Sequence, residues 1–475
     1  MAPRFGGALL LLLLLLLGHR AAGSWRAVDA AAGAFALACR AALPAPPLCA
    51  LAPPAPPGFD FSAASATPLH ASWAYAEALS LVKQHANASA LRHAALLHAN
   101  ASAAPPPYVS RVAALTALAH DLRHARAYPE ALAVLDEALG LAAGASAASP
   151  LLLAFQAEVQ SCSGDARALN ALRTLTRARK LDVAAAAAAA AAPDAPSDTA
   201  IDGALQELHL LRRALRLPGA QLPPQLRPAL QAKHDALVAR LLAAGPWRDA
   251  LQLPRHFSPA LRGAPWHDAR GGAPPGAGAA RWPAAAIAAA TALLEAAAPA
   301  QRREYAALRD GGHLEPETEC IAEPAWLLRG GDAGAWRVFT ANGPWLRDVA
   351  ESGGCSARAP AACAVMAQVA ALGLGVQRVG YSALWPGARL HPHCGASNGV
   401  LKLHLGLHVP LRGSGRPCAA LTVGNETRAW EAGKVLAFDD SFLHSVDFDG
   451  AGACERGGER VVLQVVIVHP DVTKP

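Results

Sequence analysis

Aromatic residues and methionine are scarce in this chain of 475 residues: aromatic residues make up 5% of it, and methionine occurs only twice. Lysine and arginine outnumber aspartate and glutamate by only 42 to 36, and they form no dense basic block with interleaved aromatic residues. Such a block is typical of nucleic-acid-binding surfaces, so we expect no nucleic-acid partner. The length leaves room for two or three domains.

Long leucine-rich runs are absent except at the N-terminus, and the one other long apolar run, Ala184 to Ala192, is alanine only. At the N-terminus Met-Ala-Pro-Arg precedes a leucine run, Leu9 to Leu17, and small residues follow up to Gly23. This order is typical of a secretory signal peptide, and we expect cleavage after Gly23; the alternative is an uncleaved signal anchor. An apolar stretch of about ten residues is too short for a membrane span. We therefore expect a protein of the endoplasmic reticulum or Golgi lumen, or a secreted one, with no stable membrane span.

The cysteines and glycosylation sequons agree with an oxidising compartment. Nine cysteines are present, so at least one has no partner within the chain. Cys39 with Cys49, and Cys355 with Cys363, are close enough in sequence to close small loops. Three Asn-X-Ser/Thr sequons begin at Asn87, Asn100 and Asn425. The chain is therefore expected to be a disulfide-containing glycoprotein.

Residues 63–182 have a helical pattern. Apolar residues recur every three or four positions from Ala127 to Leu141, and a similar segment follows from Gly164 to Leu175. The two segments are offset by about 37 residues, close to the period of tetratricopeptide helix pairs. We interpret this region as tetratricopeptide-like; an unrelated helical hairpin domain is the alternative.

Composition sets the remaining boundaries. Residues 24–62 are rich in alanine and proline and are expected to be poorly ordered, and an Ala/Pro linker is expected at 183–200. Residues 201–259 are predicted to be helical, with helices at Ile201–Leu215 and Pro224–Ala244. The last domain is expected at 260–475.

Strand patterns dominate after about Trp336. From Leu401 to Val409 apolar residues alternate with Lys402, His404, Gly406 and His408. Further strands are predicted by apolar segments at Val376–Leu384, Lys434–Phe438 and Val461–Val468. Short strands separated by turn residues are typical of a β-sandwich or jelly-roll barrel. The predicted class is therefore an α+β multidomain protein, helical first and then β.

Three features of the strand region could carry chemistry. His393 lies in a predicted loop just before the alternating strand, His444 follows another strand, and Arg460 opens the final one. Imidazole is a suitable ligand for iron(II), and arginine can bind a carboxylate in bidentate fashion. Because the chain has 18 histidines, a single histidine would be weak support for a metal site.

The motifs around these residues resemble the aspartyl/asparaginyl β-hydroxylase family. The resemblance extends over about residues 260–475 and is most specific in a few segments, which are Tyr381–Leu407, Asn425–Leu436, Phe438–His444, Arg460 and His469–Pro470. It implies a double-stranded β-helix, that is, a jelly roll. Animal members of the family also carry tetratricopeptide-like helices before the catalytic domain.

The resemblance implies that His393 and His444 are the iron(II) ligands. Most related oxygenases have an aspartate or glutamate two residues after the first histidine, where this chain has Gly395. The family binds iron through two histidines only, so Gly395 agrees with it. Our hypothesis is that water replaces the missing carboxylate and that the metal is held less tightly.

Five residues fall where the family binds the cosubstrate 2-oxoglutarate: Ser382, Lys402, His404, Arg460 and, as a weaker candidate, Trp336. Arg460 is expected to bind the distal carboxylate and is counted with the two histidines as catalytic. At the position of Lys402 the family usually has arginine, so lysine keeps the charge but loses the planar fork.

Three neighbouring residues are further candidates for a role at the metal site. Cys394, beside the first proposed ligand, is either a soft ligand or, as we favour, a side chain that points away. Asp439 and Asp440 are interpreted as structural or supporting residues rather than an acid–base pair. The segment between His444 and Arg460 is longer than in the family and is expected to be an extended hairpin loop.

The resemblance implies a dioxygenase that uses iron(II), 2-oxoglutarate and O2, with ascorbate as a possible supporting reductant. It would hydroxylate the β-carbon of aspartate or asparagine in a polypeptide, for which epidermal-growth-factor-like domains are the substrates in animal relatives. Two alternatives remain open. The same chemistry could act on a lipid acceptor, as in bacterial relatives, or the fold could serve a non-catalytic binding or scaffold protein.

Overall fold

The computed structural model describes residues 24–41, 47–52, 68–81, 83–101, 111–144, 149–163, 167–189, 198–217, 222–267, 284–317, 336–343, 345–346, 348–349, 354–449, 454 and 458–472. The predicted signal peptide, residues 1–23, lies outside them. The chain forms two compact units, one of Met1–Val159 with Gly343–Ser356 and one of Gln160–Asn342 with Ala357–Pro475.

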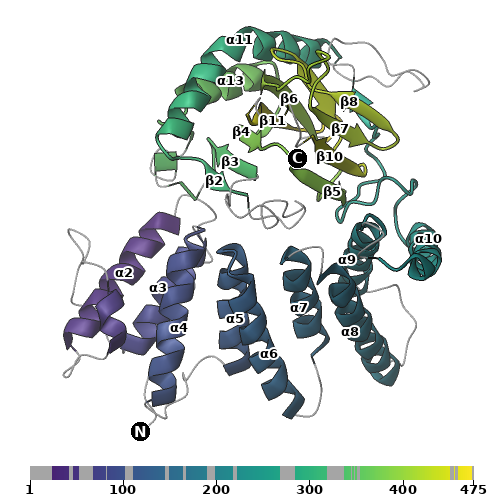
Figure 1. Cartoon of the computed structure of the whole chain (residues 1–475). Helices are drawn as coiled ribbons and strands as arrows, with labels where there is room; N and C mark the ends of the chain where they lie inside the picture. The colour runs from purple at the N-terminus through teal and green to yellow at the C-terminus, as the bar shows by residue number, and fades with distance from the viewer. Residues whose placement is uncertain are drawn as a thin grey trace. The chain divides into compact units, whose positions relative to one another are not determined.

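The first unit is helical, and consecutive helices from α2 to α6 pack side by side (Figure 1). Its packing follows the sequence: in α5 and α6 the buried residues, such as Leu115, Leu118, Ala131 and Leu135, recur at helical spacing. The helices are α2 (Ser24–Ala41), α3 (Pro68–Leu81), α4 (His85–Ala101), α5 (Arg111–His124), α6 (Tyr128–Gly144) and α7 (Pro150–Cys162), with the 3-10 turn η1 (Pro47–Leu51).

The prediction that residues 24–62 are poorly ordered is wrong for the part of that segment which the structure describes. Helix α2 and turn η1 form there, and a disulfide joins Cys39 to Cys49 as proposed. Phe35 is fully buried, and α2 packs against α3. The composition of the whole segment concealed this helix, because its prolines all follow residue 41, whereas the buried residues Val28, Ala32, Phe35 and Cys39 of α2 recur at helical spacing.

Three helices open the second unit: α8 (Ala168–Ala189), α9 (Asp198–Leu215) and α10 (Arg227–Ala244), the last preceded by the 3-10 turn η4 (Pro224–Leu226). Both helices predicted between residues 201 and 259 are therefore present. Helix α8 continues as far as Ala189, into the stretch predicted as a linker. Alanine has the highest intrinsic helix propensity, which explains the extension.

The described residues of this unit also form two antiparallel sheets. The seven-stranded sheet has the order β1-β9-β6-β11-β4-β3-β2, and the four-stranded sheet has the order β5-β10-β7-β8. The strands are β1 (Trp266–His267), β2 (Glu315–Pro316), β3 (Trp336–Thr340), β4 (Val376–Leu384), β5 (Arg389–His393), β6 (Val400–His408), β7 (Ala419–Val423), β8 (Glu426–Ala429), β9 (Val435–Phe438), β10 (His444–Phe448) and β11 (Arg460–Val468). The four strands predicted from alternation or apolar runs correspond to β4, β6, β9 and β11.

Both sheets contribute to one hydrophobic core. Leu384 and Val462 from the larger sheet pack in the same cluster as Leu421 and Val446 from the smaller sheet. Helices α11 (Ala284–Asp310) and α13 (Pro360–Ala371) pack on strands of the seven-stranded sheet (Figure 1). Side chains that point from one sheet toward the other are therefore enclosed between the two sheets.

Contacts of Glu304 attach α11 to both α13 and the sheet. Its carboxylate accepts hydrogen bonds from the first backbone N–H groups of α13, on Ala361 and Ala362, and from the buried hydroxyl of Tyr381 in β4. A carboxylate at a helix N-terminus satisfies free N–H groups and complements the helix dipole.

The fold tests two further expectations, the structural class and the predicted loop around His393. The α+β class is confirmed by the helices of the N-terminal half and the antiparallel sheets of the C-terminal region. His391–His393, predicted to lie in a loop, is instead part of β5, because β10 supplies a partner strand for it. None of the described helices is long and apolar enough to span a membrane.

Candidate active site

The strands β5 and β10 bring His393 and His444 together. The two residues are direct partners in the antiparallel pairing, and the centroids of their imidazole rings lie 4.1 Å apart. His393 ends β5 and His444 begins β10, so both rings lie at the same end of the strand pair. Residues that are 51 positions apart in sequence thus form one candidate metal-binding pair.

Backbone contacts fix the tautomer of both rings. The Nδ1–H of His393 donates to the carbonyl of His391 at 2.6 Å, and the Nδ1–H of His444 donates to the carbonyl of Phe442 at 2.9 Å. The Nε2 atom of each ring is then the unprotonated nitrogen. Burial, followed by the proximity of His393, holds the pKa of His444 well below its usual range. Neutral imidazoles oriented in this way fit a first-row divalent metal ion such as iron(II).

The position of Gly395 offers no space for a third ligand. A β-carbon there would lie 2.5 Å from Oδ2 of Asp440, whose carboxylate is in turn 2.8 Å from Nζ of Lys402. Among the residues that the structure describes, a group of three metal-competent side chains occurs only elsewhere, at His85, His120 and Asp121. The pair His393 and His444 therefore agrees with a two-histidine site rather than with two histidines and a carboxylate.

Arg460 is a buried cation with unused hydrogen-bond donors. Its side chain is 2% exposed, and its Nε and Nη1 atoms have no hydrogen-bond partner in the described part of the chain. The guanidinium lies over the ring of Trp430, 4.4 Å from the ring centroid. Burial lowers its pKa to about 9, so the group stays charged at neutral pH. A buried guanidinium with free donors is suited to binding a carboxylate.

His404, on β6, faces the same aromatic residue. Its ring stacks on Trp430 and meets Phe438 edge-on, with centroids 4.9 Å apart in the second pair. Neither ring nitrogen has a hydrogen-bond partner within the described ranges. Burial, with Lys402 and Arg460 nearby, holds the pKa of His404 well below its usual range, so this ring is a neutral donor and acceptor.

Trp336 and Ser382 are joined directly. The indole Nε1–H of Trp336, on β3, donates to Oγ of Ser382, on β4, at 3.0 Å. The two residues belong to adjacent paired strands. The contact orients the serine hydroxyl, whose own hydrogen can then point elsewhere.

One cavity contains all seven residues that the sequence singled out. Its lining combines residues of both sheets, and the seven are Trp336, Ser382, His393, Lys402, His404, His444 and Arg460. Cys394 does not line it; the thiol lies 4.0 Å from the carbonyl of Leu251, and burial raises its pKa. The side chain of Cys394 thus points away from the cavity, as favoured.

Several other residues that line this cavity were not among those predicted from the sequence. Arg378 lies on the same face of β4 as Ser382, and Gln464 lies on the same face of β11 as Arg460. The period of two along a strand could have identified both. Trp430 and Phe438 could not be found in this way, because their positions depend on how the strands pack together.

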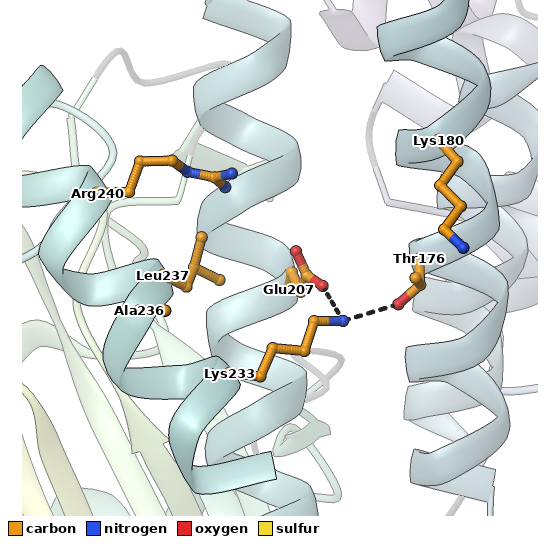
Figure 2. Close-up of a pocket in the computed structure, with 7 residues that line it drawn as sticks. All are labelled: Thr176, Lys180, Glu207, Lys233, Ala236, Leu237 and Arg240. Atoms are coloured by element: carbon orange, nitrogen blue, oxygen red, sulfur yellow. Dashed lines mark hydrogen bonds and ion pairs between the residues drawn. The ribbon is translucent and has the colours of Figure 1, made fainter. Parts of the chain in front are cut away.

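A second cavity lies between α8, α9 and α10 (Figure 2). Lys180, Lys233 and Arg240 line it, but Nζ of Lys233 is already 2.6 Å from the buried carboxylate of Glu207 and donates to Thr176. Among the described residues that line this cavity there is no histidine or cysteine. The candidate metal ligands His393 and His444 therefore do not lie in this cavity but in the one between the sheets.

Comparison with known proteins agrees with this location. A sequence model of the family described as aspartyl/asparaginyl beta-hydroxylase matches residues 295–470. The mouse aspartyl/asparaginyl beta-hydroxylase is 36% identical over 143 residues, which are 30% of this chain and 17% of the relative. The mouse aspartate beta-hydroxylase domain-containing protein 1 is 43% identical over 93 residues, which are 20% of this chain and 23% of the relative.

The matched segment is thus short compared with the whole relatives. For the mouse aspartate beta-hydroxylase domain-containing protein 2, identity is 40% over 91 residues, or 19% of this chain and 24% of the relative. The chain therefore spans less than a quarter of the length of each of these three relatives. The family match nevertheless includes both histidines and Arg460. Residues 295–470 of this chain are therefore similar to the aspartyl/asparaginyl β-hydroxylase family.

Proposed function

We propose that this chain is an iron(II)- and 2-oxoglutarate-dependent dioxygenase that hydroxylates the β-carbon of aspartate or asparagine in a polypeptide. One observation carries the proposal: the buried guanidinium of Arg460, with unused donors, shares a cavity with the paired imidazoles of His393 and His444. A metal site and an anion site in one enclosed space fit a cosubstrate that has a carboxylate at each end.

His393 and His444 would hold iron(II) through their Nε2 atoms. The bound metal would supply the activation of O2 that is coupled to decarboxylation of 2-oxoglutarate. In the overall reaction, 2-oxoglutarate, O2 and a C–H bond give succinate, carbon dioxide and a C–OH group. With Asp440 filling the space beside Gly395, water would complete the coordination. Ascorbate would serve only to keep the iron reduced.

The remaining residues of the cavity would position 2-oxoglutarate. Arg460 would bind its distal carboxylate, and His404 and Ser382 would offer further hydrogen bonds. The ammonium of Lys402, which Asp440 would hold in place, would line the cosubstrate cavity. The apolar rings of Trp430 and Phe438 would exclude water and so strengthen each of these interactions.

We propose a double-stranded β-helix for the two-sheet domain and a tetratricopeptide-like function for the helices of the first unit. Stacked helix pairs form concave surfaces that bind polypeptides. The proposed substrates are epidermal-growth-factor-like domains, which occur in the same oxidising compartments.

The proposed location is the secretory pathway. The disulfides Cys39–Cys49 and Cys418–Cys454 require an oxidising environment. Asn87 and Asn425, which begin two of the sequons, are exposed and accessible to glycosylation.

The test is succinate production by the purified chain with iron(II), ascorbate, 2-oxoglutarate and a peptide from an epidermal-growth-factor-like domain. We expect peptide-dependent succinate and a peptide mass increase of one oxygen. His393→Ala should abolish both. His408→Ala should retain both, because His408 is exposed on β6 and does not line the cavity.

Two other results would change the proposed function. Turnover with a lipid acyl acceptor but not with the peptide would keep the chemistry and replace the substrate. A folded protein that binds neither iron nor 2-oxoglutarate would refute the proposal in favour of a non-catalytic binding protein.

A further inference from the structure

Three histidines surround one buried carboxylate in the first unit, within the helical region and outside the family match. His85 begins α4, and His120, Asp121 and His124 lie in the last turn and a half of α5. His120 and His124 are four residues apart and therefore lie on one face of the helix. Asp121 is fully buried, whereas the side chain of His120 is 51% exposed. The cluster thus has an anionic centre and an open side.

The distances suit a small metal ion. Oδ1 of Asp121 is 2.9 Å from Nδ1 of His85 and 3.8 Å from Nδ1 of His120. Ligand atoms around a tetrahedral zinc ion, at about 2.0–2.1 Å from the metal, lie roughly 3.4 Å from one another. One ligand atom from each of the three residues can be chosen so that all lie within 4.8 Å of one another. Small rotations of two imidazole rings would therefore complete the geometry.

Hydrogen bonds from outside the histidine cluster orient the carboxylate of Asp121, as is common for carboxylates that bind metals. Oδ2 of Asp121 accepts a hydrogen bond from Nε of Arg92 at 2.7 Å, and the hydroxyl of Ser80 donates to Oδ1 at 2.7 Å. Residues that ligate a metal are commonly held by such outer hydrogen bonds. Oδ1 is the oxygen that faces the histidines, because Arg92 binds the other one.

His124 completes the surroundings without being a required ligand. Its ring stacks on that of His85, with centroids 4.5 Å apart, and its Nε2 accepts a hydrogen bond from Arg123 at 2.8 Å. Burial, followed by the charge of Arg123, lowers the pKa of His124 to about 3, so the ring stays neutral. The stacking restricts the orientation of His85.

The local charge tolerates a divalent cation. Both neighbouring guanidinium groups have their own carboxylate: Arg92 is 2.8 Å from Glu77, and Arg123 pairs with Glu158. Because Arg92 also contacts Asp121, the two guanidinium groups stand against three carboxylates, and this group carries one more negative than positive charge. The pKa of Asp121 is lowered despite its burial, because hydrogen bonds from His120 and His85 and the charge of Arg92 outweigh desolvation.

We propose that His85, His120 and Asp121 form a second metal site, specific for a divalent transition metal of the zinc class and separate from the His393–His444 pair. Two nitrogen ligands and one oxygen ligand are a donor set that zinc favours, with water in the open position on the exposed side of His120. The proposal does not depend on the oxygenase function. It assigns the helical region a metal-stabilised junction between α4 and α5.

The test is zinc stoichiometry and affinity of the metal-depleted full chain, measured by competition with a chromogenic chelator. His120→Ala is the main variant, because its exposed side chain can be removed with little effect on packing. His93→Ala is the matched control, since His93 is an exposed histidine of α4 outside the cluster. His393→Ala removes the contribution of the other candidate site.

We expect one zinc equivalent that persists in His393→Ala and His93→Ala and whose affinity falls at least 100-fold in His120→Ala. X-ray absorption of the zinc-loaded His393→Ala protein should show imidazole nitrogen and oxygen ligands; this measurement needs no change in the cluster. If His120→Ala and His93→Ala bind zinc equally well, or if all zinc is lost in His393→Ala, the proposal is wrong.

Discussion

The backbone N–H of Gly395 donates to the carbonyl of Asp440 at 2.6 Å, and the carboxylate of Asp440 fills the space in which a side chain on Gly395 would begin. The position that carries a metal-binding carboxylate in most related oxygenases is therefore closed by a neighbouring residue. Asp440 is itself neutralised by Lys402 at 2.8 Å. The proposed two-histidine site thus agrees with the packing around Gly395 as well as with the sequence.

The first prediction concerns Gly395→Asp. The new carboxylate would collide with Asp440, place two anions side by side and disrupt the Lys402 pair. We expect weaker iron binding and a lower melting temperature, rather than the tighter binding that a restored carboxylate would give. Isothermal titration with iron(II) under anaerobic conditions checks the first and calorimetry the second. Tighter iron binding with unchanged stability would contradict this account.

Arg460→Lys tests whether the guanidinium of Arg460 binds the distal carboxylate of 2-oxoglutarate. Lysine keeps the charge but has no planar fork, and a charged hydrogen bond contributes about 1.5–3 kcal/mol. The KM for 2-oxoglutarate should therefore rise about 10- to 100-fold. The control is Arg416→Lys, which lies on an exposed turn away from the cavity. Equal KM values for the two variants would remove Arg460 from the cosubstrate site.

Lys402 and Asp440 should behave as a coupled pair. Lys402→Met leaves the carboxylate of Asp440 without its cation, and Asp440→Asn leaves the ammonium without its anion. Since the lysine side chain is 19% exposed, each single change should cost about 2 kcal/mol, less than for a fully buried pair. The double variant should be more stable than the sum of the two losses implies. Chemical unfolding of all four proteins measures this coupling, and strict additivity would argue against it.

The buried carboxyl group of Asp439 is expected to make the stability of the protein depend on pH. It is fully buried, one carboxylate oxygen accepts from the backbone of Ser441, and the other has no hydrogen-bond partner among the described residues. Burial raises its pKa to about 7, above the value of about 3.9 expected in the unfolded chain. The neutral form is favoured by folding, so this contribution to stability is complete below about pH 4 and is lost as the pH rises through 7.

Asp439→Asn removes that titration. The free energy of unfolding of the wild type, measured relative to the variant in urea at several pH values, should decrease between pH 5 and pH 8. A difference that stays constant with pH would mean that Asp439 is ionised throughout, and its raised pKa would then be wrong.

Much of the sheet could be predicted because its strands carry their own pattern. In β6 alternating leucines face the core, and β11 is a long apolar segment after Arg460 that only Gln464 interrupts, so local sequence alone places them. The strand β5 was missed since Pro392 interrupts a five-residue segment, and it forms only because β10 offers a pairing edge. The helix α2 was missed because the prediction weighed the composition of residues 24–62 as a whole, although the prolines of this segment all follow α2.

The sequence by itself determined the chemical inventory: two histidines, an arginine and a lysine on a strand pattern that resembles one family. Tertiary structure decided how these residues are placed relative to one another. It brought His393 opposite His444, left the donors of Arg460 unpaired in a buried cavity and put Asp440 where a third ligand would stand. It also gathered His85, His120 and Asp121 from two helices. Pairing and burial depend on contacts between residues far apart in the chain, which local periodicity does not encode.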